Sequence, residues 1–231
     1  MGNNIIGKVT LVGFGPGNPD LLTIAAVRAL EEADIIFYDA LIDTGYLNRF
    51  KAVKTSVGKR SGKHSASQEE INVLLADAAT KYRNIVRLKG GDPMIFGRAG
   101  EEIAYLESRG IEVNVIPGIT TASALAADTK VSLTQRGISQ SVAFINGHAD
   151  RPLTPDAETL VYYMGASHLA DIAQALLKQG KDAGTPVLMV YNVSMPDHKI
   201  FHTDIKTLAK GAQEFPTPLI VLVGEVAKET F

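Results

Sequence analysis

The sequence contains no cysteine among its 231 residues. Without cysteine the chain cannot form disulfides, thiolate metal sites or iron–sulfur clusters, and no thiol can act as a nucleophile. The sequence also lacks an apolar run of about 18 residues, the length that a helix needs to cross a bilayer. Its first eight residues are short of apolar side chains, so they do not resemble a signal peptide. We therefore expect a soluble, cytoplasmic protein.

A strong charge of either sign is absent as well. The chain has 23 basic and 25 acidic residues and a formal net charge of -2. A nearly neutral chain gives no overall electrostatic attraction to nucleic acid or to an anionic membrane. The five histidines show none of the spacings of a metal motif such as H-E-x-x-H, so we predict no metal site. A hydrophobic content of 45% is ordinary for a globular protein.

Short apolar runs alternate with helical patterns in the first half of the chain. Strands are predicted for residues 8–12, 35–38, 85–88 and 113–116. Apolar residues that recur every three or four positions predict helices after Asn18, after Ser67 and over residues 100–108. Ser67 and Glu70 match a capping box, which marks the start of a helix.

The second half is richer in strands. A helix of small residues is predicted over 120–127, and Ser167 is predicted to cap a further helix. Strands are predicted for residues 142–145, 159–163, 186–190, 199–203 and 219–223. The change in pattern predicts two α/β domains, residues 1–117 and residues 118–231.

A glycine-rich loop at residues 13–18 follows the first strand and opens a helix, as the phosphate loop of a dinucleotide-binding domain does. Asn18 occupies the place of the third glycine, however, and Pro16 removes a backbone N–H from the loop. These two residues disfavour a nucleotide-dependent oxidoreductase. The segment 58–64 likewise lacks the spacing of a P-loop.

Seven segments resemble, in the same order, the signatures of the tetrapyrrole methylase family. They are residues 12–23 (VGFGPGNPDLLT), 38–42 (YDALI), 57–64 (VGKRSGKH) with 68–72, 86–98 (VRLKGGDPMIFGR), 117–123 (PGITTAS), 140–142 with 147–148, and 162–165 (YYMG). The resemblance extends over about residues 8–226. One tripeptide would be a weak indication, but seven segments in the family's order are specific.

The resemblance implies a fold of two α/β domains with S-adenosyl-L-methionine in the cleft between them, in a homodimer. The cofactor contacts that it implies are Pro16, Gly90, Gly91, Asp92, Ile95, Thr120, Thr121, Met164 and Val193. The family has glycine where this chain has Val193, so a backbone contact there requires valine to tolerate a glycine conformation. The expected partners are a tetrapyrrole substrate and a second copy of the chain, with no nucleic acid and no membrane.

The block at residues 57–64 is similar to the branch of the family that methylates ring carbons of uroporphyrinogen III, giving precorrin-2 for sirohaem and cobalamin biosynthesis. That substrate is rich in carboxylates, which cationic side chains can bind. The implied substrate contacts are Arg60, Lys63, His64, Arg98 and Arg136. Methylation of a ring carbon is followed by loss of a proton, and a nearby carboxylate can accept it. Asp39 is the implied catalytic residue, with Lys59 as a second.

Several alternatives remain open from the sequence. Another enzyme of the same fold could act on a later precorrin, on rRNA or on a diphthamide precursor. An rRNA enzyme would be expected to be more basic than a chain of net charge -2. A nonenzymatic tetrapyrrole-binding relic is a further alternative, and the presence of both Asp39 and Lys59 argues against it.

Overall fold

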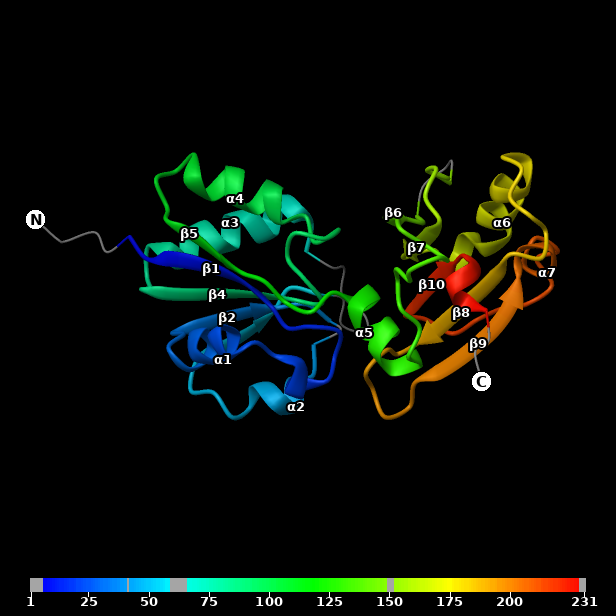
Figure 1. Ribbon diagram of the computed structural model, residues 1–231. Helices are drawn as coiled ribbons and strands as arrows, with labels where there is room; N and C mark the ends of the chain where they lie inside the picture. Colours follow the sequence, from blue (N-terminus) through cyan, green and yellow to red (C-terminus); the bar gives the residue numbers. More distant parts are fainter. Residues whose placement is uncertain (1–5, 41, 59–65, 149–151, 229–231) are drawn as a thin grey trace, which may run out of the picture. The chain divides into compact units, whose positions relative to one another are not determined.

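The computed structural model describes residues 6–40, 42–58, 66–148 and 152–228 (Figure 1). The chain forms two compact units, Met1–Thr120 and Thr121–Phe231. The boundary expected from the sequence lies at residues 117 and 118. Within the described residues, none of the helices combines the length and the apolar character required to cross a membrane.

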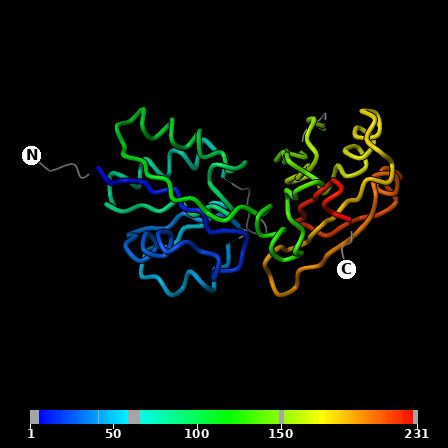
Figure 2. Tube along the Cα trace, in the orientation of Figure 1, coloured from blue at the N-terminus to red at the C-terminus, as the bar shows by residue number. Residues whose placement is uncertain are grey.

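The first unit contains a sheet of five parallel strands in the order β3-β2-β4-β1-β5. The strands are β1 (Lys8–Gly13), β2 (Ile35–Tyr38), β3 (Val53–Ser56), β4 (Asn84–Lys89) and β5 (Val113–Ile116). The helical elements are η1 (Pro19–Leu21), α1 (Ile24–Glu31), α2 (Thr44–Leu47), α3 (Gln68–Ala79) and α4 (Ala99–Glu107). The alternation of strand and helix can be followed along the Cα trace in Figure 2. An all-parallel sheet needs helices on both faces, because its strands are buried on both sides.

Helices cover the two faces of this sheet in pairs (Figure 1). Buried side chains of α3 and α4 pack on the face that carries Val9 and Ile35. Buried side chains of α1 and α2 pack on the opposite face, which carries Val12 and Ile36. Successive residues of a strand point to opposite faces, so each central strand contributes to both cores.

The sequence pattern predicts the start of α3 correctly, but not the start of α1. The capping box is present: Ser67 Oγ accepts from Glu70 N, and Glu70 Oε2 accepts from Ser67 N. The helix expected after Asn18 begins instead as the 3-10 turn η1, because Leu22 is extended. Thr23 then caps α1 by accepting from the backbone N–H of Ala26.

The second unit contains a mixed sheet in the order β6-β7-β10-β8-β9. Its strands are β6 (Val142–Asn146), β7 (Thr159–Tyr163), β8 (Pro186–Tyr191), β9 (Lys199–Asp204) and β10 (Leu219–Val223). The pair β6 and β7 is parallel, and the other neighbours are antiparallel. The helical elements are α5 (Thr121–Thr129), η2 (Ala166–His168), α6 (Leu169–Lys178), α7 (Ile205–Leu208) and η3 (Glu225–Ala227).

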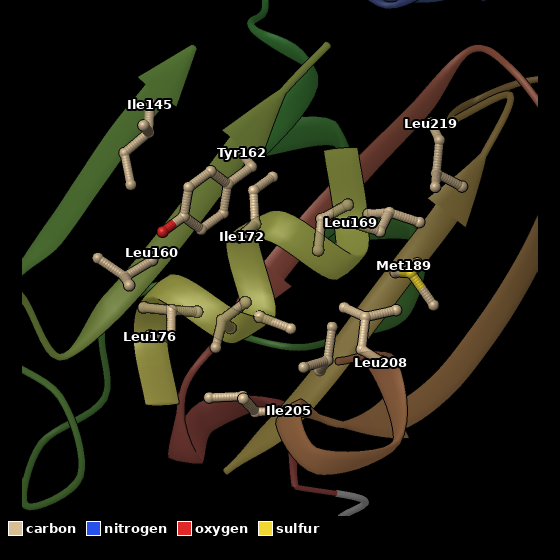
Figure 3. Close-up of a cluster of buried hydrophobic side chains, with 14 residues drawn as sticks. Ile145, Leu160, Tyr162, Leu169, Ile172, Leu176, Met189, Ile205, Leu208 and Leu219 are labelled. Atoms are coloured by element: carbon tan, nitrogen blue, oxygen red, sulfur yellow. The ribbon is translucent and has the colours of Figure 1, made fainter. Parts of the chain in front are cut away.

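One core of this unit lies between α6, α7 and one face of the sheet (Figure 3). Ile172 and Leu176 of α6 are directed toward Leu160 and Tyr162 of β7. The prediction that Ser167 caps α6 is wrong. The N-cap is His168, which makes no capping hydrogen bond through its side chain, and Ser167 lies inside the preceding turn η2.

Candidate catalytic and cofactor site

Parallel pairing brings the ends of β1, β2 and β4 to one edge of the first sheet. Gly13 is in register with Lys89, and Tyr38 is in register with Leu88. The chain therefore places Asp39 and Gly90, the residues that follow β2 and β4, at the same carboxyl edge. This edge is where open α/β sheets bind their ligands.

Four glycines at this edge lie where backbone segments approach one another closely. A Cβ on Gly13 would meet Gly118 N at 2.5 Å, and a Cβ on Gly118 would meet Gly91 O at 2.2 Å. Gly15 and Gly91 exchange hydrogen bonds, with N to O distances of 2.7 and 3.2 Å. The glycine loop therefore works as a structural contact that joins β1 to the turn after β4.

Asp92 fixes that turn through its carboxylate. Oδ1 accepts from Met94 N at 2.8 Å, and Oδ2 accepts from Gly118 N at 3.0 Å. The side chain thus ties the turn after β4 to the segment after β5. Ile95 lies three residues after Asp92, and its N–H donates to Asp92 O at 3.2 Å.

Gly90 differs from its glycine neighbours because it has open space around it. A Cβ there would meet nothing within 4 Å, and the residue is exposed. The packing of the fold does not require glycine at this position. Because glycine has no side chain, a ligand can approach its backbone closely. Gly90 therefore fits the cofactor contact that the family resemblance implies, as does the half-buried Pro16 beside the Gly15–Gly91 pairing.

Of the six described residues other than glycine that have left-handed backbone, five lie in segments that the sequence marks as functional, and the sixth is Lys130. Phe96 and Arg98 have φ of 53° and 55°, and Met164 has φ of 56°. In the Tyr191–Ser194 segment the left-handed residues are Asn192 and Ser194. Such conformations cost free energy, and they occur preferentially at binding sites.

The candidate residues of the second unit are connected through α5. Ala122 N, next to Thr121, donates to Tyr163 Oη at 3.2 Å, so the start of α5 is held beside the residue that precedes Met164. The other end of α5 carries Asp128, whose Oδ2 accepts from Ser194 N at 2.6 Å. Thr120, the last residue of the first unit, is half-buried.

Met164 and Val193 have opposite environments. The side chain of Met164 is 51% exposed, so this methionine is not a core residue. Val193 is 4% exposed and is absent from the residues of positive φ. The valine therefore does not need a glycine conformation, and it adds buried apolar surface instead.

A buried charge cluster lies beneath Asp39. Arg87 Nη2 donates to Asp39 Oδ1 at 2.6 Å, and Arg87 Nε donates to Glu102 Oε1 at 3.3 Å. Lys89 Nζ contacts both oxygens of Glu102, and Gln68 Nε2 donates to Oε1 at 3.1 Å. Among the charged residues of the cluster, Asp39 has 35% side-chain exposure, against 0–4% for Arg87, Lys89 and Glu102 beneath it.

Burial changes the acid–base properties of this cluster. Burial lowers the pKa of the Lys89 ammonium below its ordinary value, and the charge of Arg87 lowers that pKa further. Glu102 opposes both effects through its charge and its hydrogen bonds. Buried charges are tolerated when they are paired and hydrogen-bonded, as these are.

The sequence contains a signal for this cluster. Alternation along β4 places Arg87 and Lys89 on the same face as the buried Ile85, where two cations require an anion. Glu102 lies on the buried stripe of α4, between Ala99 and Leu106 at helical spacing. A carboxylate on an apolar stripe opposite two buried cations predicts an ion pair.

The implied substrate contacts are placed only in part. Lys59, Arg60, Lys63 and His64 lie outside the described residues. Arg98 donates to both oxygens of Glu101, at 2.8 and 2.6 Å, and these hydrogen bonds raise the pKa of Arg98 and lower that of Glu101. Arg136 is exposed on a turn closed by hydrogen bonds between Gln135 and Ser139.

Comparisons with known proteins agree with this fold. The family model of the Tetrapyrrole (Corrin/Porphyrin) Methylases matches residues 8–209. The chain is 40% identical to a siroheme synthase of Actinobacillus pleuropneumoniae and 41% identical to one of Zymomonas mobilis, over 98% and 95% of this chain. In both cases it covers 49% of the relative, so the chain spans about half the length of these curated relatives.

Solved structures give the same result over whole chains. The native uroporphyrin III C-methyl transferase from Thermus thermophilus is 38% identical with a TM-score of 0.82, over 95% of this chain and 93% of that one. The Thermus enzyme complexed with S-adenyl homocysteine has a TM-score of 0.83 at 38% identity, over 96% and 94%. A cobalt precorrin-4 methyltransferase shares the fold at 24% identity, with a TM-score of 0.81 and coverage of 99% of both chains. The expected architecture of two α/β units is confirmed, and the chain belongs to the tetrapyrrole (corrin/porphyrin) methylase family.

Proposed function

We propose that this chain methylates ring carbons of uroporphyrinogen III, forming precorrin-2. Family membership makes the chain an S-adenosylmethionine-dependent tetrapyrrole methyltransferase. The observation that carries the finer proposal is the likeness to the Thermus uroporphyrin-III enzyme, which extends over almost the whole of both chains. The block at residues 57–64 supports the same branch. We further propose that the enzyme is a homodimer.

The chain offers residues that fit the cofactor. In the first unit the open backbone at Gly90, the adjacent Gly91 and Asp92, and Pro16 and Ile95 are proposed to hold it. Thr120, at the end of that unit, and Thr121, Met164 and Val193 of the second unit are proposed as further contacts. When bound, S-adenosylmethionine supplies an electrophilic methyl group. The residues around it position the acceptor carbon, because much of the rate of such a transfer comes from alignment.

Asp39 is proposed to accept the proton that the ring carbon loses once it carries the new methyl group. Its carboxylate is anchored by Arg87 at Oδ1 and remains 35% exposed, so it is both positioned and accessible. A fixed carboxylate also stabilises positive charge that develops on the ring. Lys59 is proposed as a second participant in proton transfer, and Arg60, Lys63, His64, Arg98 and Arg136 as contacts of the substrate carboxylates.

The test is a mass spectrum of the tetrapyrrole after incubation with S-adenosylmethionine and enzymatically generated uroporphyrinogen III. A gain of one or two methyl masses is expected. No gain, with cofactor binding seen by calorimetry, would move the substrate to a later precorrin or a non-tetrapyrrole acceptor. Loss of cofactor binding as well would favour a nonenzymatic relic.

A further inference from the structure

Arg87 joins the buried charge cluster to the exposed carboxylate of Asp39. Its side chain is 3% exposed, and its Nη2 lies 2.6 Å from Asp39 Oδ1. A hydrogen bond between a buried guanidinium and a carboxylate is short and charge-assisted, so it restricts the orientation of the carboxylate. The orientation of Asp39 therefore depends on how firmly Arg87 itself is held.

Arg87 is held from two further directions. Nε donates to Glu102 Oε1 at 3.3 Å, and Nη1 donates to the backbone oxygen of Leu88 at 3.1 Å. The guanidinium is planar with fixed donor directions, so three acceptors on α4, β4 and the end of β2 fix its plane. Glu102 is fixed in turn by Lys89 and Gln68.

The charge balance of the cluster also links Arg87 to Asp39. Arg87 and Lys89 contribute two positive charges, and Glu102 contributes one negative charge inside the fold. Asp39 supplies the second negative charge at the surface of the cluster. Among the described residues of the cluster, Asp39 is therefore the anion that balances the second buried cation, and it is the residue to which the mechanism assigns the proton transfer.

We propose that Arg87 is a positioning residue of the methyl transfer, which holds the Asp39 carboxylate in the orientation that meets the substrate. This proposal rests on the proposed function, in which Asp39 acts on the substrate. Arg87 does not touch the substrate in this account and acts only through Asp39. Its loss should therefore lower the turnover number and leave the binding of cofactor and substrate unchanged.

A double-mutant cycle of Arg87→Gln and Asp39→Asn tests the proposal. Each single variant should lower kcat, and Asp39→Asn is expected to do so by about 100-fold or more, as for loss of a general base. In the Asp39→Asn background the Arg87 change should alter kcat by less than about threefold, because interacting residues are not additive. The KM of both substrates, and cofactor affinity by calorimetry, should stay at wild-type values.

Lys89→Gln is the matched control. It removes the same charge from the same cluster, but Lys89 hydrogen-bonds to Glu102 and interacts with Asp39 through its charge alone, without holding the Asp39 carboxylate. Whatever its effect on kcat, that effect should multiply with the effect of Asp39→Asn. Arg87→Lys keeps the charge without the planar fork, and it should recover part of the kcat lost in Arg87→Gln. If circular dichroism shows that Arg87→Gln is unfolded, Arg87→Lys takes its place in the cycle.

The outcomes separate the two proposals. An Arg87 effect of equal size in both backgrounds, or one confined to KM or cofactor affinity, would overturn the positioning role while Asp39 keeps its own. Full turnover in Asp39→Asn would instead remove the catalytic assignment of Asp39 and the positioning role together. A wild-type enzyme that transfers no methyl group would reject the proposed substrate before the cycle begins.

Discussion

Glu102 accepts hydrogen bonds from Lys89 Nζ at 2.9 and 3.0 Å, and neither side chain is more than 4% exposed. This pair lies under the carboxyl edge of the first sheet, directly before the Gly90–Gly91 turn. A buried pair of this kind is costly to break, because the partner that remains keeps its charge without compensation. The pair therefore ties the stability of the first unit to the geometry of its candidate site.

Glu102→Gln should destabilise the protein strongly. The change keeps the shape of the side chain but leaves Lys89 and Arg87 without their shared anion, a loss of about 3–5 kcal/mol in the free energy of unfolding. Urea denaturation measures it. Glu101→Gln is the matched control, because the adjacent Glu101 is exposed and pairs with the exposed Arg98. A similar loss in both variants would contradict the role assigned to the buried pair.

Because of Lys89, the free energy of unfolding should change with pH in the alkaline range. Its folded-state pKa lies below the ordinary value of 10.5, because burial and the charge of Arg87 disfavour the ammonium. Between these two pKa values the unfolded chain binds more protons, so the contribution of Lys89 to stability rises with pH. The free energy of unfolding of the wild type minus that of Lys89→Met should therefore increase as pH approaches 10.5. A difference that stays flat or falls would show that this pKa is not lowered.

Hydrophobic pattern and capping chemistry predicted most of the elements because they act locally. The missed elements are short or polar. The strand β3 has no fully buried residue, and α2 and α7 have only four residues each. Ser167 does not cap α6 because the 3-10 turn η2 precedes the helix and includes this serine. Neither the turn nor the edge strand leaves a period in the sequence.

The sequence predicts the backbone of the candidate site and the ion pair of Glu102 with its buried cations, but not the link from Arg87 to Asp39. The turn at Gly90 and Gly91 is visible in the sequence because glycine marks unusual backbone. Asp39 could be placed at a strand end, but its ion pair with Arg87 joins residues 48 positions apart, and no local pattern reports such a distance. At position 193, where the family has glycine, the sequence suggested a glycine conformation that the valine does not adopt. The left-handed backbone lies instead at its neighbours Asn192 and Ser194.

Gly90→Ala should weaken cofactor binding without unfolding the protein. The added Cβ meets no protein atom within 4 Å, so the fold tolerates it, whereas a ligand lying against this backbone does not. We expect S-adenosylmethionine to bind about tenfold more weakly or worse, equivalent to about 1.4 kcal/mol in calorimetry. Gly100→Ala is the control, because its Cβ also meets nothing and Gly100 lies within α4. Unchanged affinity in Gly90→Ala would exclude Gly90 from the cofactor site.

Val193→Gly should restore the family's residue at a cost in stability. The valine side chain is 4% exposed, and removing a buried side chain of this size costs about 1.5–3 kcal/mol. Cofactor affinity should stay unchanged, because the proposed contact is made by the backbone. Thermal unfolding and calorimetry measure the two effects. A rise in affinity on substitution would mean that the valine side chain hinders the cofactor.

Asp39→Ala should abolish most turnover while the protein still binds S-adenosylmethionine. The carboxylate at the end of β2 is proposed to take the proton from the methylated ring, and loss of a general base typically costs about 10²–10⁴ in rate. Single-turnover methyl transfer gives the rate, and calorimetry gives the cofactor affinity. Asp43→Ala is the control, because Asp43 caps α2 through Gly45 N at 2.8 Å and should affect stability alone. Equal turnover in Asp39→Ala and wild type would move the proton transfer to another group, and Lys59 would then be the residue to replace.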